Sequence, residues 1–187
     1  TLKFDKEKGF FLNGERMKLK GVCLHHDLGP LGAAVNTRAI ERQLEMLKEM
    51  GCNAIRTSHN PSAVELLDLC DRMGIMVQVE AFDEWKMGKC TNGYNTLFDK
   101  WAERDLTDLI HRDRNHPGVI MWSIGNELRE QDAADGGKVA QFLTDIVHRE
   151  DPTRPSTAGF NNHWGAITNG LADAVDLVGF NYKHFDY

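Results

Sequence analysis

Short apolar segments alternate with amphipathic ones along most of this chain, and this alternation constrains the fold more than any other feature. The apolar segments, which we expect to be strands, lie at residues 53–57, 75–79, 119–124, 156–158 and 177–180. Between several of them, apolar residues recur every three or four positions at 37–50, 98–113 and 139–147, which predicts helices with one buried face. Strands that alternate with helices form a parallel sheet with right-handed crossovers. We therefore expect an α/β protein.

Capping residues predict where two helices begin and end. Thr37 is the expected N-cap of the first helix, and Gly51 is positioned to end it. Ser62 and Glu65 have the spacing of a capping box, and the apolar run that follows them closes at Gly74.

The N-terminal residues have the pattern of a β-hairpin. Asn13-Gly14 separates two β-compatible stretches, 10–12 and 17–22, and this dipeptide favours a two-residue turn. We expect the hairpin to lead into a buried strand. No linker, internal repeat or low-complexity segment follows, so residues 1–187 are expected to form one domain.

Polar residues collect directly after the expected strands, and this placement decides between two architectures. A nucleotide-binding open sheet would show G-x-G-x-x-G or a P-loop after a strand, and the sequence has neither. The polar residues are His25, His26, Asp27, Arg56, Ser58, His59, Glu80, Asp83, Glu84, Asn126, Glu127, Asn181 and Tyr182. Functional residues at the carboxyl ends of many strands are typical of the (β/α)8 TIM-type barrel, which has about 250 residues. With 187 residues and about six strand candidates, the chain is expected to form an incomplete, truncated barrel of about the first six β/α units.

Composition excludes several classes of partner. Lys and Arg number 22 against 28 Asp and Glu, a formal charge of −6, so there is no basic face for nucleic acid. No apolar run approaches the roughly 18 residues of a membrane span. The charged opening TLKFDKEKG argues against a signal peptide, and the four separated cysteines indicate neither zinc nor disulfides. We expect a soluble protein and leave its compartment open between cytoplasm and periplasm.

Glu127 is the strongest candidate for a catalytic residue. The segment 122–127, WSIGNE, places an amide and a carboxylic acid at the mouth of an apolar strand. A protonated carboxyl group there can donate to a leaving oxygen, and the Asn126 amide can hold a substrate hydroxyl without adding charge. A structural role stays open at this point, in which Glu127 favours the first turn of a following helix.

The loops after two neighbouring strands hold further candidates. Arg56 could position a carboxylate, while His59 could donate to a sugar hydroxyl; stabilisation of the loop explains both residues equally well. The acidic residues after strand 75–79 lie beside Trp85, a combination that suits carbohydrate stacking and hydrogen bonding. A solvated loop would have the same composition.

Five motifs together carry a family resemblance. In chain order they are KGVCLHHDLGPLG, MGCNAIRTSHNP, LCDRMGIMVQVEAFDEW, RDRNHPGVIMWSIGNE and DLVGFNY. They resemble the catalytic barrel of glycoside hydrolase family 2, the family of β-galactosidases, β-glucuronidases and β-mannosidases. The similarity extends over essentially the whole chain, and five linked motifs are far more specific than any one of them.

The resemblance implies hydrolysis of terminal β-linked sugars with retention of configuration, by two carboxylates about 5 to 5.5 Å apart. Glu127 matches the family's general acid/base, and the nucleophile, a glutamate on the seventh strand, is expected beyond the end of this chain. Asn126 matches the amide that contacts the sugar 2-hydroxyl, and Tyr182 the tyrosine that hydrogen-bonds the nucleophile. The remaining expected contacts to the carbohydrate are His25, Asp27, Arg56 and His59.

No metal or other cofactor is expected. Some β-galactosidases of the family place a magnesium ligand where Glu84 stands and a histidine two residues on, but this position is Lys86 here, which cannot ligate while charged. His25 and His26 are adjacent and would point to opposite faces of a strand, which disfavours a metal pair. Leu24 replaces an arginine found in many members, so the sugar stays open.

Two other classes of function remain as alternatives. A catalytically inactive carbohydrate-binding fragment would keep the polar lining without paired carboxylates. A barrel lyase or aldolase would need a strand-end lysine or a metal cluster, and no strand candidate ends in such a lysine. A barrel that lacks strands would also expose two sheet edges, so we expect the fragment to self-associate through them or to cover them with its termini.

Overall fold

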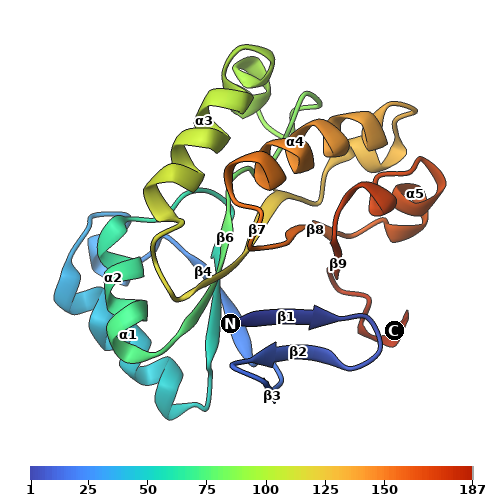
Figure 1. Cartoon of the computed structure of the whole chain (residues 1–187). Helices are drawn as coiled ribbons and strands as arrows, with labels where there is room; N and C mark the ends of the chain where they lie inside the picture. The colour runs from blue at the N-terminus through green and yellow to red at the C-terminus, as the bar shows by residue number, and fades with distance from the viewer. Residues whose placement is uncertain (187) are drawn as a thin grey trace.

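A six-stranded parallel sheet forms the centre of the molecule. The computed structural model describes residues 1–186, and the strands of the sheet follow one another in the order of the sequence. They are β4 (Gly21–His25), β5 (Ala54–Ser58), β6 (Met76–Glu80), β7 (Val119–Asn126), β8 (Ser156–Phe160) and β9 (Leu177–Phe180). Helices lie along one side of the sheet, while the N-terminal strands lie on the other (Figure 1). This arrangement confirms the expected incomplete TIM-type barrel of six parallel strands.

Within residues 1–186 there are five α-helices, and each contributes buried residues to the core. They are α1 (Thr37–Glu49), α2 (Val64–Met73), α3 (Phe98–Asp113), α4 (Gly136–Glu150) and α5 (His163–Thr168). The bounds of α3 are those that the apolar spacing predicts, and α4 extends further at both ends than predicted. The short helix α5 had no apolar periodicity long enough to be predicted.

Two expected helix caps are wrong and two glycine stops are confirmed. The N-cap of α1 is Asn36, whose side chain accepts from the Ala39 N–H, rather than Thr37. Ser62 forms no capping box, because α2 begins after Ala63 and the buried Ser62 hydroxyl has no hydrogen-bond partner among the described residues. Both stops, Gly51 and Gly74, have positive φ angles, which glycine adopts without steric cost.

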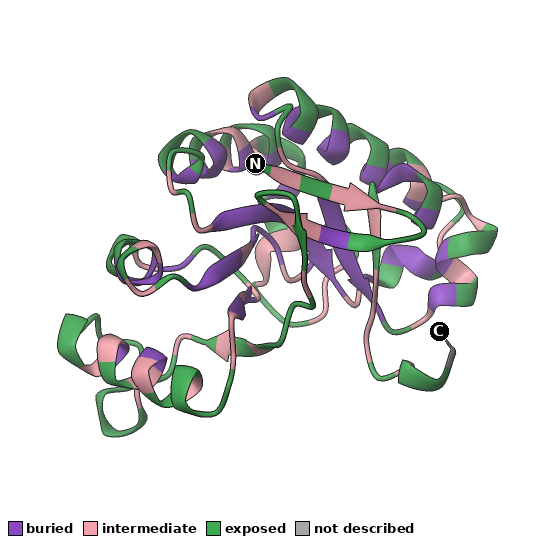
Figure 2. Cartoon of the chain, turned by 60° about the horizontal axis from the view of Figure 1, so that its bottom comes forward, coloured by how far each residue is buried: buried purple, intermediate pink, exposed green. Residues whose placement is uncertain are grey.

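A small antiparallel sheet covers the amino ends of the barrel strands. It consists of β1 (Leu2–Asp5), β2 (Gly9–Leu12) and β3 (Glu15–Arg16). Asn13 and Gly14 form the expected turn, both with positive φ, but β1 was not predicted and β3 ends at Arg16. Phe10 packs on residues of three barrel strands, so this sheet closes the bottom of the barrel (Figure 2).

Burial follows from position in the sheet. Every residue of β7 is buried, whereas β4 alternates between exposed and half-buried residues. Helices α3 and α4 cover the outer side of the central strands, and their apolar residues form one continuous core with the sheet. None of the helices within residues 1–186 is both long and apolar enough to cross a bilayer.

Candidate active site

Glu80 is the hub of a polar network at the carboxyl ends of the central strands. Its side chain is fully buried. Its Oε2 accepts hydrogen bonds from Arg56 Nε at 2.8 Å, Arg56 Nη2 at 2.7 Å and Ser123 Oγ at 2.5 Å. Its Oε1 lies 2.6 Å from His59 Nδ1. Residues on β5, on β7 and in the loop after β5 are thus tied to one carboxylate.

Local strand geometry explains why these groups meet. Glu80 on β6 is paired in register with Ser123 on β7, so their side chains leave the sheet on the same face. Burial of Arg56 opposes its charge, but the Glu80 carboxylate outweighs this effect and raises the pKa of Arg56. Arg56 is therefore a fixed cation in the floor of the site.

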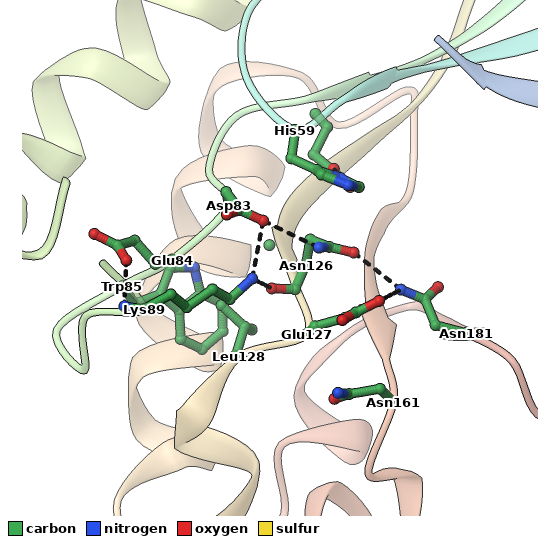
Figure 3. A network of polar contacts seen from close by, with 12 residues as sticks. His59, Asp83, Glu84, Trp85, Lys89, Asn126, Glu127, Leu128, Asn161 and Asn181 are labelled. Atoms are coloured by element: carbon green, nitrogen blue, oxygen red, sulfur yellow. Dashed lines mark hydrogen bonds and ion pairs between the residues drawn. The ribbon is translucent and has the colours of Figure 1, made fainter. Parts of the chain in front are cut away.

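Asn126 and Glu127 stand at the end of β7, above this floor. Asn126 Oδ1 accepts from Arg56 Nη2 at 2.8 Å and from Asn181 Nδ2 at 2.9 Å. The same Asn181 amide donates to Glu127 Oε1 at 2.9 Å, as Figure 3 shows. A Cβ on Gly159 would lie 2.9 Å from Arg56 Nη2, so the glycine leaves room for this approach. The expected acid and amide are held side by side.

Glu127 has an unusual backbone conformation. Its φ is +45°, in the left-handed region that few residues other than glycine adopt. Its N–H donates to the Gly159 carbonyl at 2.7 Å. The alternative role at the first turn of a helix is excluded, because α4 begins only at Gly136 and Leu128 is the N-cap of the short 3-10 helix between them.

Asp83 and Lys89 form the side of the site next to Asn126. Asp83 Oδ1 accepts from Asn126 Nδ2 at 3.0 Å and from Lys89 Nζ at 2.9 Å. Burial tends to raise the pKa of Asp83, but the hydrogen bonds from Lys89 and Asn126 outweigh it and lower the pKa. Asp83 is consequently an anion that fixes the orientation of the Asn126 amide.

The remaining expected site residues lie on the two outer strands or the loops after them. Tyr182 is 73 % exposed, and its hydrogen bond with the Glu127 carboxylate raises the pKa of Tyr182. The His25 ring contacts the His59 ring edge-on, with 5.0 Å between centroids. Asp27 is exposed and accepts from the Gly29 N–H of its own loop. The structure thus brings His25 to the network, whereas the bond that Asp27 accepts lies within its own loop.

Trp85 and Glu84 in the loop after β6 have structural roles where the sequence suggested a surface for carbohydrate stacking. Trp85 is fully buried, and its indole N–H donates to the Ile124 carbonyl at 2.7 Å, so the expected stacking surface is wrong. The Glu84 carboxylate accepts the backbone N–H groups of Lys89 and Asn95. Lys86 pairs with Asp99 at 2.8 Å. Within residues 1–186, no group of three or more metal-ligating side chains has the arrangement to hold a metal ion.

Five members of the network were not among the predicted site residues. Glu80 and Asp83 were noted only as part of an acidic loop, and Asn181 only as a strand-end residue. Ser123 and Lys89 gave no signal, because a serine inside an apolar strand and a lysine in a loop are common. Register would have identified Ser123, since it lies opposite Glu80.

A wide pocket opens beside the network. It has a volume of about 510 Å³ and borders His59 and Asp83. Its lining also includes Phe82 and Tyr94, whose rings stack with 4.9 Å between centroids. The network therefore adjoins open space of the size of a small ligand.

The fold and the site define a TIM-type barrel domain with a carboxylic acid and an amide at the end of its fourth strand. Comparison with known proteins agrees with this class. Residues 4–184 match the model of the TIM barrel domain of glycosyl hydrolases family 2. The chain belongs to this family.

Relatives and solved structures cover almost all of the chain. A β-galactosidase of Bacteroides ovatus, BoGH2A, is 47% identical over 100% of this chain and 26% of its own length. A β-glucuronidase of Bacteroides fragilis is 36% identical over 90% of this chain and 25% of its own. A family 2 glycosyl hydrolase from Bacteroides cellulosilyticus superimposes with a TM-score of 0.93 at 48% identity, over 97% of this chain and 23% of that structure. The chain spans about a quarter of the length of these proteins.

Proposed function

We propose that the protein containing this chain hydrolyses terminal β-linked sugars with retention of configuration, and that Glu127 is its general acid/base. One observation carries the proposal: the Glu127 carboxylate and the Asn126 amide are held together at the mouth of the barrel by Asn181. The names of the similar proteins, β-galactosidase and β-glucuronidase, support the substrate class. Which sugar is cleaved stays open.

Glu127 acts twice in this mechanism. As an acid it protonates the glycosidic oxygen while a second carboxylate, about 5 to 5.5 Å away, attacks the anomeric carbon and forms a glycosyl-enzyme. As a base it then takes a proton from the water that releases the sugar. We assign the nucleophile to a residue beyond position 187.

The other expected residues bind or orient the sugar. Asn126 has its carbonyl oxygen turned to Arg56 and its NH2 group to Asp83, so the amide is prepared to meet a hydroxyl without reorganisation. His59, in the loop after β5, and His25, at the end of β4, are proposed to donate to hydroxyls. Asp27 and Tyr182, which follow the outer strands β4 and β9, are proposed as further contacts, and Tyr182 also as the hydrogen-bond partner of the nucleophile.

The test is Glu127→Gln in the full-length protein, assayed on two substrates. On a glycoside with a poor leaving group, kcat/KM should fall by on the order of 10²-fold or more, because the leaving oxygen no longer receives a proton. An activated nitrophenyl glycoside should lose less at the cleavage step. Glu65→Gln, on the exposed face of α2, is the matched control. Unchanged turnover on both substrates with Glu127→Gln would contradict the assignment.

A second candidate for the isolated chain is carbohydrate binding without turnover. The observation behind it is that the carboxylates beside Glu127 are already engaged: Glu80 by Arg56 and His59, and Asp83 by Lys89. Neither is free to serve as a nucleophile. Purified chain should therefore release no nitrophenol from β-galactosides, β-glucuronides, β-mannosides or β-glucosides at enzyme-like rates. Steady release that Glu127→Ala abolishes would show that an internal carboxylate is the nucleophile.

A further inference from the structure

We propose that Lys89 is a positioning residue for the Asn126–Glu127 peptide, and through it for the acid/base carboxylate. This inference rests on the proposed role of Glu127. Lys89 does not lie on a barrel strand but in the loop between β6 and α3, 37 residues before Asn126 in the chain. Its ammonium group nevertheless reaches the mouth of the barrel (Figure 3).

The peptide that joins Asn126 to Glu127 is held at both ends. Lys89 Nζ donates to the Asn126 carbonyl oxygen at 2.6 Å, and the Glu127 N–H donates to the Gly159 carbonyl at 2.7 Å. A peptide unit fixed at its oxygen and at its nitrogen cannot rotate. Because Glu127 has φ +45°, a conformation that side-chain-bearing residues rarely adopt unaided, the surrounding contacts must hold it.

Lys89 also connects the backbone of Asn126 to its side chain. The ammonium lies 2.9 Å from Asp83 Oδ1, and the same oxygen accepts from Asn126 Nδ2 at 3.0 Å. The Lys89 side chain is 23% exposed, so its charge is only partly screened by water. One cation and one anion thereby fix both the carbonyl and the amide of the residue before Glu127.

The loop that carries Lys89 is itself firmly placed. The buried Glu84 carboxylate accepts the Lys89 N–H at 2.5 Å and the Asn95 N–H at 3.0 Å. A Cβ on Gly93 would lie 1.9 Å from Glu84 Oε1, so any other residue at this turn would displace the carboxylate. The Trp85 indole fastens the loop to β7. The backbone of Lys89 is therefore fixed, and its side chain is preorganised for the hydrogen bond to the Asn126 carbonyl.

Without the Lys89 ammonium group, the Glu127 carboxylate should still be present but displaced from its catalytic position. A displacement of about 1 Å in a catalytic group can cost about 10²-fold in rate. The loss should fall on the protonation step, so it should depend on the leaving group in the same sense as the loss in Glu127→Gln. A residue that only stabilised the loop would lower turnover of all substrates equally.

The experiment compares Lys89→Met with Lys86→Met in the full-length protein. Lys86 lies three residues away in the same loop, with its side chain 49% exposed and paired to Asp99 on the surface. For Lys89→Met we expect kcat/KM to fall about 10- to 100-fold on a glycoside with a poor leaving group, and several-fold less on a nitrophenyl glycoside. Lys86→Met should stay within about twofold of the wild type on both.

Lys89→Arg keeps the experiment decisive if Lys89→Met does not fold. The guanidinium retains the charge but cannot occupy the position of a single ammonium, so a smaller loss with the same dependence on the leaving group is expected. Equal losses on both substrates, or kinetics like those of Lys86→Met, would overturn the positioning role. Glu127→Gln in parallel separates the two proposals: if it shows no dependence on the leaving group, the proposed function itself fails.

Discussion

The centre and the two edges of the sheet are built differently. Strands β5, β6 and β7 are mostly or fully buried and carry the network around Glu80, whereas β4 and β9 are paired on one side only within residues 1–186. The edge residues His25, at the end of β4, and Tyr182, just after β9, are exposed. Figure 2 shows the same contrast between buried central strands and green outer segments.

This difference separates two kinds of site residue. Those at the centre are oriented by contacts within the chain, so the acid, the amide and their supporting charges form a preorganised unit. Those at the edges have few contacts that would fix them. We therefore expect substitutions at the centre to destabilise the fold as well as the site, and substitutions at the edges to leave the stability of the fold nearly unchanged.

The largest effect is expected at the hub. Glu80→Ala leaves Arg56 buried without its partner, and breaking a buried ion pair on one side costs about 3–5 kcal/mol. Urea unfolding of the purified chain should show this loss in the free energy of unfolding. Glu65→Ala on the exposed face of α2 is the control and should change it by less than about 0.5 kcal/mol. A small loss for Glu80→Ala would mean that the central network does not stabilise the fold.

A second effect of central contacts is a dependence of stability on pH. Asp151 is almost fully buried and accepts from the Trp122 indole at 2.9 Å. Burial raises its pKa, but hydrogen bonds from Thr153, Arg154 and Trp122 outweigh burial and lower the pKa below 3.8. The unfolded carboxyl group therefore takes up its proton at higher pH than the folded one, and the stability that Asp151 contributes above about pH 4 is lost as the pH falls through the folded pKa.

Asp151→Asn removes this dependence. The variant should be about 2 kcal/mol less stable than the wild type at pH 7, because its charge-assisted hydrogen bonds are weakened. The difference between the two proteins should shrink between pH 5 and about pH 3. Urea unfolding at several pH values measures it, with Asp68→Asn on the surface of α2 as control. A difference that stays constant with pH would contradict the lowered pKa.

A pair of histidines gives the most direct comparison of centre and edge. His59→Ala leaves the buried Glu80 Oε1 without this partner and should cost about 1–2 kcal/mol. His25→Ala removes an exposed ring at the end of an outer strand and should cost less than about 0.5 kcal/mol. Both variants should lower turnover in the full-length protein. Equal losses of stability would mean that the edge is as firmly integrated as the centre.

The sequence predicted the elements better than it predicted their contacts. Apolar spacing is a local property, so it located five of the six strands of the parallel sheet and the whole of α3, whereas β4 lies mostly beyond the stretch 17–22 that was expected to be a strand. The cap at Asn36 and the short helix α5 depend on where the chain turns after packing, which spacing does not record. The strand β1 is too short and too charged to show a period of its own.

The same limit applies to the site. Parallel strands bring their carboxyl ends to one edge, so the candidates at Arg56, His59 and Glu127 could be placed there from sequence. Which side chains bond to one another could not, because Glu80 meets Arg56 across 24 residues and Ser123 across 43. The predicted role of Trp85 was wrong for the same reason. An aromatic residue in a loop suggests a surface for ligand stacking, and only its three-dimensional neighbours show that it is buried.

The smallest effect on stability, and the clearest test of the edges, is expected at β9. Within residues 1–186 one side of β9 has no neighbouring strand and offers backbone N–H and C=O groups for pairing, and we propose that this chain self-associates there and at β4. Val178 on β9 is 39% exposed, so Val178→Lys should change the free energy of unfolding by less than about 0.5 kcal/mol while its charge blocks pairing of the edge. Val64→Lys, at a valine 40% exposed on α2, adds the same charge away from any strand. Sedimentation over a range of concentrations should show the wild type and Val64→Lys associating, and Val178→Lys shifted toward the monomer. If the wild type stays monomeric, the edge strands do not pair with a second copy and the proposal is wrong. If the wild type, Val64→Lys and Val178→Lys associate equally, the contact between copies lies away from β9.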